Sequence, residues 1–175
     1  MFHKILVAVN NSDVTQQIFD QALSLAKATN AELIIMYVLS PFDERYPTPP
    51  GMGTDGIYSP FTTDDVNYYL GKWESLKHEG IELLTLLTNQ AIAQGVNAEY
   101  TQEFGDPGRM ICEVGRKAQA DLIIIGRRGL SGIKEFFLGS VSNYVLHHAH
   151  CSVLTVQGAL DDSTPTPKAM LAESA

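Results

Sequence analysis

Several features are scarce in this 175-residue chain, and each scarcity narrows the class of protein it can be. It has only two cysteines, Cys112 and Cys151, and we expect both to be buried thiols and not a disulfide. No apolar run approaches the ~20 residues of a membrane span. The N-terminal apolar run is short and is typical of a strand, not of a signal peptide. We therefore expect a cytoplasmic protein.

Positive charge is also scarce, because 12 Lys and Arg face 20 Asp and Glu, for a formal net charge of −8. This balance argues against general binding to nucleic acid or to an anionic membrane. A phosphorylated ligand would need local cations or backbone N–H groups. The chain has neither a G-x-x-x-x-G-K-[ST] loop nor a G-x-S-x-G elbow. Asn10 and Asn11 stand where a phospho-acceptor receiver domain needs acidic residues.

Apolar runs and helical periodicities alternate along the chain, which predicts an α/β fold. The pattern is that of a doubly wound three-layer sandwich, with four helices around a five-stranded parallel sheet. We expect one domain over residues 1–157, with an irregular insertion at 40–61, and a disordered tail at 158–175. The expected strands are Lys4–Asn10, Leu33–Leu39, Ala98–Phe104, Leu122–Ile125 and Ser152–Val156. The first expected helix ends near Thr29, and the second runs from Thr62 or Thr63 to about Gln94. The third follows Pro107, and the fourth covers Ser140–His148.

The insertion contains Gly51, Gly53 and Gly56, which match the dinucleotide-binding fingerprint. That fingerprint needs a strand before it and a helix after it, and here prolines surround it. We therefore interpret the insertion either as a flap beside a ligand or as a plain surface segment.

The long helix after the insertion carries an apolar stripe, and Gly80 in its middle predicts a kink. Tyr68, Tyr69 and Trp73 could stack on a base, but core packing is the favoured interpretation. The stripe consists of Val66, Leu70, Trp73, Leu76, Leu84, Leu87 and Ala91.

The most informative stretch follows the fourth predicted strand. Gly126 and Gly129 allow positive φ and a close approach of the backbone to a ligand. Nine residues later, Gly139 precedes Ser140, which we expect to be the N-cap of the last helix. Such a loop and helix N-terminus bind anions, usually phosphate, although the same spacing also suits a plain β–α turn. Arg127, Arg128 and Lys134 add positive charge locally.

The spacing G-x-x-G, nine residues, G-S resembles the nucleotide-binding signature of the universal stress proteins, and the resemblance covers roughly residues 2–157. It implies the strand order 3-2-1-4-5, bound ATP (or AMP or ADP left from it) with or without Mg²⁺, and a homodimer through the last strand. Asn10 stands where the family often has aspartate, and Arg127 where a small serine is common. The residues that the resemblance places at the nucleotide are Ala8, Asn10, Ser12, Val38, Gly126, Arg127, Arg128, Gly129, Gly139, Ser140 and Val141.

The resemblance implies a nucleotide-dependent sensor or regulator. A slow ATPase is the first alternative, with Asp13 or Asp106 as candidate bases. The second is a dimerisation module that binds no nucleotide. His147, His148 and His150 beside Cys151 suggest a metal site, but adjacent residues on a helix point in different directions, which disfavours it.

Overall fold

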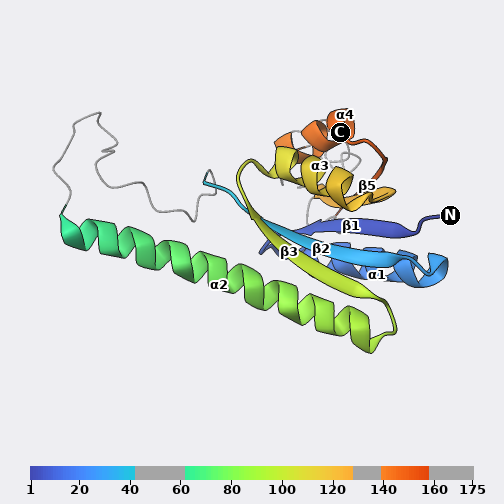
Figure 1. The fold of residues 1–175 in the computed structure, drawn as a ribbon, viewed down its shortest axis with the longest axis horizontal. Helices are drawn as coiled ribbons and strands as arrows, with labels where there is room; N and C mark the ends of the chain where they lie inside the picture. Colours follow the sequence, from blue (N-terminus) through green and yellow to red (C-terminus); the bar gives the residue numbers. More distant parts are fainter. Residues whose placement is uncertain (42–61, 128–138, 158–175) are drawn as a thin grey trace, which may run out of the picture.

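A computed structural model describes residues 1–41, 62–127 and 139–157 (Figure 1). Residues 42–61, which hold the three glycines of the insertion, the segment 128–138 and the tail at 158–175 lie outside the described residues. The described elements are β1 (Lys4–Val9), α1 (Thr15–Thr29), β2 (Glu32–Leu39), α2 (Thr63–Ala93), β3 (Ala98–Phe104), α3 (Pro107–Ala118), β4 (Leu122–Arg127), α4 (Ser140–His148) and β5 (Ser152–Gln157).

The described strands form one parallel sheet in the order β3-β2-β1-β4-β5, which confirms the predicted fold class and strand order. Ala8 of the central strand pairs with Met36 on β2 and with Ile125 on β4. The chain leaves β1 toward one edge of the sheet and leaves β4 toward the other. The carboxyl ends of β1 and β4 therefore form the switch point at which ligands of such folds bind.

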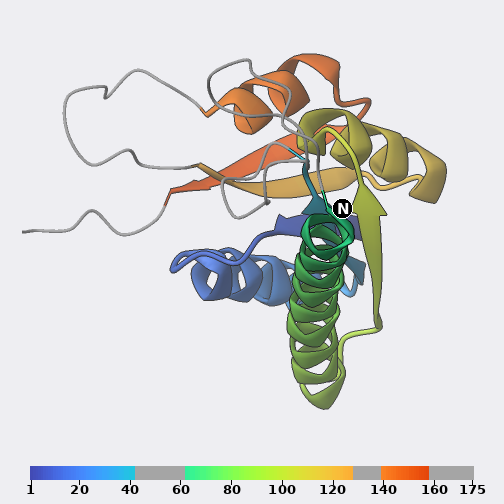
Figure 2. The same cartoon turned by 90° about the vertical axis from the view of Figure 1, so that its left-hand side faces the viewer.

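Both faces of the sheet are covered, which explains why β1 is apolar throughout. Ile5 and Val7 face a core shared with α1 and α2, whereas Leu6 faces a second core shared with α3 and α4. Figure 2 shows the two helix pairs on opposite sides of the sheet.

Capping residues define the ends of α2 and the start of α3. Thr62 caps α2 and forms a capping box with Asp65, and Gly95 ends the helix with φ +81°. Asp106 caps α3, with Pro107 in its first turn.

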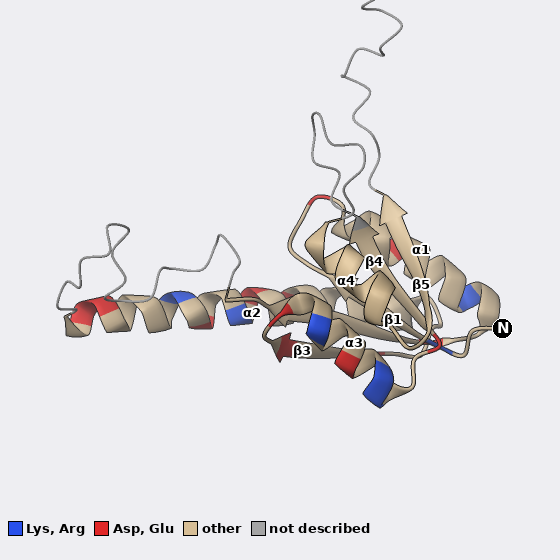
Figure 3. Cartoon of the chain, turned by 90° about the horizontal axis from the view of Figure 1, so that it is seen from above, with Lys and Arg blue, Asp and Glu red and all other residues tan. Residues whose placement is uncertain are grey.

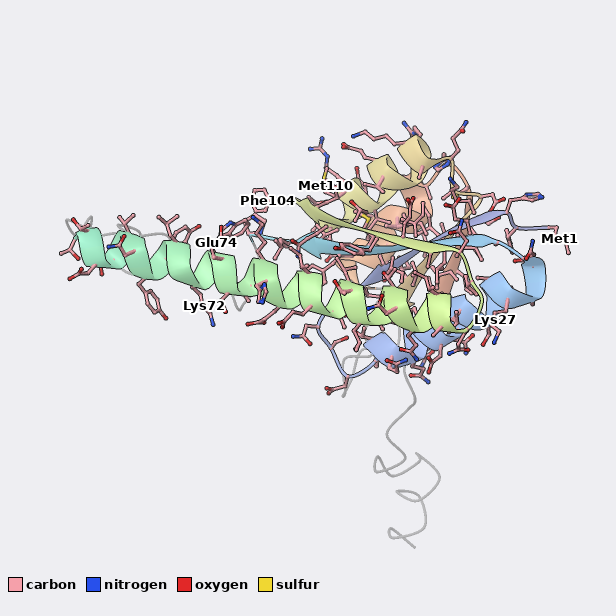
Figure 4. All side chains as sticks on the ribbon, turned by 60° about the horizontal axis from the view of Figure 1, so that its bottom comes forward. Met1, Lys27, Lys72, Glu74, Phe104 and Met110 are labelled. Carbon is pink, nitrogen blue, oxygen red and sulfur yellow. The ribbon has the colours of Figure 1, made fainter. Side chains whose placement is uncertain are left out.

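Helix α2 is longer than the sheet that it covers. Its 31 residues span about 46 Å, whereas the eight residues of β2 span about 26 Å. Its N-terminal part therefore projects beyond the carboxyl ends of the strands, with Lys72 and Glu74 on the projecting turns (Figures 1 and 4). The acidic Asp64 and Asp65 stand at its tip, as the red ribbon in Figure 3 shows.

This projection corrects part of the predicted core. Tyr68 is 71% exposed and Leu70 is 52% exposed, so core packing was the wrong interpretation for both. The reason is that none of the described strands lies beneath that part of the helix. Trp73 contacts Phe104 edge to face with ring centroids 4.9 Å apart, and the buried stripe begins at Leu76.

Both cysteines are free thiols; Cys112 is buried as predicted, whereas Cys151 is only partly buried. Burial raises the pKa of Cys112 and that of Cys151, so both are weak nucleophiles at neutral pH. Within the described residues, no helix is long and apolar enough to cross a membrane. The cytoplasmic location stays a prediction.

Candidate functional site

The turn after β1 is fastened by its own polar side chains. Ser12 Oγ donates to Asn10 Oδ1 at 2.7 Å, and the Thr15 hydroxyl donates to the Asn10 carbonyl oxygen. Ser12 N–H donates to the same carbonyl at 3.1 Å. Helix α1 begins at Thr15 with Val14 as its N-cap, so Asp13 is not the cap. The Asp13 carboxylate is exposed, and it has no hydrogen-bond or ion-pair partner among the described residues.

A buried hydroxyl joins the end of β4 to the start of α4. Ser142 is only 3% exposed, and its Oγ donates to the carbonyl oxygen of Gly126 at 3.1 Å. This bond connects the two ends of the glycine-rich stretch, although the residues between them lie outside the described part of the chain. The sequence analysis missed Ser142. A small polar residue one turn into an otherwise apolar helical face was the available signal.

Helix α4 begins without a side-chain cap. Gly139 is the N-cap, and Ser140 is the first helical residue, so the prediction of a Ser140 cap was wrong. The first N–H groups of an α-helix have no acceptor inside the helix. Those of Ser140, Val141 and Ser142 have no acceptor among the described residues. A Cβ built on Gly139 would meet no described atom within 4 Å, so no described residue fills the space beside it.

Gly126 does not adopt the positive φ that the sequence predicted, and its contact with a ligand stays a prediction. Positive φ among the described glycines occurs at Gly95 and Gly105, not at Gly126. A Cβ on Gly126 would instead overlap Cδ1 of Ile18 on α1. The glycine therefore leaves room for the end of the Ile18 side chain, which packs from α1 onto the end of β4.

Three other predicted residues lie on one side of the sheet. Ala8, Val38 and Val141 are each partly buried and pack against the core shared by α3 and α4. They form an apolar wall below the carboxyl ends of β1 and β2. The backbone of Arg127 ends β4, but its side chain, together with Arg128 and Gly129, lies outside what the structure describes.

The remaining candidates have other partners. Asp106 Oδ1 accepts the backbone N–H of Arg109 at 2.9 Å, which occupies that carboxylate at the start of α3. His148 stacks on Tyr144 with ring centroids 4.0 Å apart, and its Nδ1 lies 2.8 Å from the Tyr144 carbonyl oxygen. This stacking and the helical geometry turn His148 toward its own helix.

Taken together, the fold and the site define a class: a parallel α/β sandwich with an uncapped helix N-terminus at its switch point. The sequence profile of the universal stress protein family matches residues 1–157. Universal stress protein Sll1388 of Synechocystis is 36% identical over 160 residues, which cover 89% of this chain and 98% of that protein. YxiE of Bacillus subtilis is 35% identical over 158 residues, which cover 90% of this chain and 100% of that protein. The chain belongs to the universal stress protein family.

Solved structures share the fold at lower identity. A universal stress protein family protein from Arabidopsis thaliana with AMP bound has a TM-score of 0.59 and 23% identity, covering 95% of this chain and 99% of that one. A universal stress protein in complex with cAMP has a TM-score of 0.58 and 24% identity, covering 89% and 97%. One from Archaeoglobus fulgidus in complex with dAMP has a TM-score of 0.54 and 18% identity, covering 87% and 96%.

Proposed function

We propose that this protein binds an adenine nucleotide at the carboxyl ends of β1 and β4 and acts as a nucleotide-dependent sensor or regulator. The observation that carries the proposal is the start of α4. Its first N–H groups have no acceptor among the described residues, no described atom lies close to a Cβ built on Gly139, and Ser142 ties the helix to the end of β4. The positive end of the helix dipole favours a phosphate at this point.

The neighbouring groups suit the rest of a nucleotide. Ala8, Val38 and Val141 offer an apolar wall for a base, and Asn10 offers a polar contact at the end of β1. Arg127 and Arg128 bring positive charge into a stretch of an otherwise acidic chain. Solved relatives hold AMP, cAMP or dAMP, and we propose ATP, or AMP or ADP left from it, for this chain.

The proposal includes a homodimer through β5. The two edges of the sheet differ in charge: β3 carries Glu99 and Glu103, whereas β5 has no charged residue and exposes Leu154. Charged side chains on an edge strand discourage pairing with another chain, and an uncharged apolar edge favours it. We therefore place the second copy against β5.

The test is to denature the purified protein and identify any released small molecule by mass, then to titrate ATP, ADP and AMP by calorimetry. An adenine nucleotide in the released fraction, or stoichiometric binding in the titration, supports the proposal. The absence of both, in a protein that melts cooperatively, would leave the dimerisation module as the function.

A further inference from the structure

The polar turn after β1 holds the side-chain amide of Asn10 in one orientation. An asparagine presents an acceptor oxygen on one side and a donor NH₂ group on the other, and the hydrogen-bond network decides which side faces which partner. The partners here are the hydroxyl groups of Ser12 and Thr15. Thr15 is only 6% exposed and donates its single hydroxyl hydrogen to the Asn10 carbonyl oxygen.

The distances assign the amide oxygen to the inside of the turn. Ser12 Oγ lies 2.7 Å from Asn10 Oδ1, a typical length for O–H···O and shorter than the usual N–H···O bond. Ser12 Oγ lies 3.4 Å from Thr15 Oγ1, so Asn10 Oδ1 is the nearer acceptor for the Ser12 hydrogen. The NH₂ group of Asn10 therefore points away from the turn, and it has no hydrogen-bond partner among the described residues.

We propose that Asn10 is a specificity-determining residue of the nucleotide site: its NH₂ group donates to an acceptor oxygen of the ligand, and the nucleotide binds without a divalent cation. This inference rests on the function proposed above and specifies the form of its ligand, a free nucleotide anion. An aspartate at this position would present a second carboxylate oxygen instead, which accepts hydrogen bonds and binds Mg²⁺.

The other oxygen ligands near the site do not fit a protein-held Mg²⁺. The oxygen of Asn10 accepts from Ser12, and Asp106 accepts the Arg109 N–H at the start of α3. Of the described candidate carboxylates, Asp13 remains, and it is exposed. In the described ranges, no three His, Cys, Asp or Glu side chains converge in a way that could hold a metal ion. The donors that are available for phosphate are N–H groups, and these need no cation to meet an anion.

The experiment titrates the full chain with AMP and with ATP by calorimetry, once in EDTA and once in excess MgCl₂. For wild type we expect AMP to bind with the same dissociation constant in both buffers, and ATP to bind in EDTA at least as tightly as with magnesium. Asn10→Asp keeps an acceptor for the Ser12 hydroxyl, so the turn is retained. We expect the nucleotide affinity of this variant in EDTA to be about tenfold lower than that of wild type, a change of about 1.4 kcal/mol in binding free energy. With magnesium, the variant should regain affinity.

Two variants serve as controls. Asn11→Asp adds the same charge at an exposed neighbouring side chain, and it should bind like wild type in both buffers. Asp13→Asn removes the exposed carboxylate and should not change the response to magnesium. Wild-type binding that disappears in EDTA, or an Asn10→Asp variant that binds like wild type in both buffers, would overturn the inference while the proposed function stands. No binding of either nucleotide in either buffer would instead refute the proposed function and this inference with it.

Discussion

At the scale of single residues, the two glycines that flank the undescribed stretch have different roles. Gly126 is closed in by Ile18, whereas no described atom lies close to a Cβ built on Gly139. A side chain at Gly126 would therefore disturb the packing of α1. A loss of nucleotide binding in a Gly126 variant would not show whether the glycine contacts the ligand. A side chain at Gly139 would fill the space that the proposed phosphate needs.

We predict that Gly139→Val abolishes ATP binding in calorimetry and leaves the melting temperature of the free protein almost unchanged. A β-branched side chain at this point blocks the approach of phosphate to the first N–H groups of α4. Gly71→Val is the matched control, because Gly71 also has no atom within 4 Å of a built Cβ and lies on the projecting part of α2. Undiminished ATP binding by Gly139→Val would refute the proposed phosphate position.

Ser142 provides a second prediction. Ser142→Ala removes the bond to the Gly126 carbonyl, which we expect to cost about 1 kcal/mol of stability and to weaken ATP binding severalfold. Thr88→Val is the control, since Thr88 is a buried hydroxyl on the distant half of α2 that donates to the Leu84 carbonyl. Calorimetry and urea unfolding measure the two effects. If both variants lose stability and neither loses affinity, Ser142 has only a structural role.

At the scale of elements, α2 has two glycines in contrasting surroundings. Gly71 lies on the exposed projecting part. A Cβ on Gly80 would overlap Nε2 of Gln102 and would lie 3.1 Å from ring atoms of Tyr37. Gly80 therefore leaves room for side chains of β2 and β3 where α2 crosses them, and the kink expected there stays a prediction.

We predict that Gly71→Ala raises the free energy of unfolding by about 0.5–1 kcal/mol, because alanine is the better helix former. Gly80→Ala gains the same propensity but has to displace Gln102, which donates to the Lys77 carbonyl, and to crowd Tyr37. It should therefore be less stable than Gly71→Ala by about 1–3 kcal/mol. Urea unfolding of the two variants measures the difference. Equal stabilities would mean that α2 can move away from the sheet at no cost.

At the scale of the whole molecule, the two sheet edges lead to an assembly prediction. Light scattering at micromolar concentration should give a dimer for wild type and a monomer for Leu154→Lys, because a charge on β5 discourages pairing. Tyr100→Lys on β3 is the control: Tyr100 is likewise exposed but belongs to the edge that already carries charge, so this variant should remain dimeric. A wild-type monomer would count against the β5 interface.

The whole site also predicts slow chemistry. Hydrolysis needs an oriented water and a base. Backbone N–H groups that bind the ground-state phosphate as tightly as the transition state do not accelerate the reaction. Asp106 is occupied at the start of α3, and Asp13 alone is exposed without a partner. We expect turnover far below the ~1 s⁻¹ low end of enzymes in a single-turnover assay with excess protein and labelled ATP. Complete conversion within seconds, abolished by Asp13→Ala, would favour the ATPase alternative.

The sequence by itself determined the elements and the position of the glycine-rich stretch. These are local properties. Short, β-branched apolar runs such as Ile5–Val9 favour strands covered on both faces, and Thr62, Asp106 and Gly95 act on the backbone beside them. The strand order came from the family resemblance and not from any local pattern.

Only the tertiary structure decided how neighbours across the fold use those residues. The length of α2 relative to the sheet left Tyr68 in solvent, and the approach of α1 made Gly126 a packing residue. The bond from Ser142 to Gly126 joins the start of α4 to the end of β4, which folding brings together. Spacing along the chain does not encode such contacts, because they are set by which surfaces meet once the core has packed.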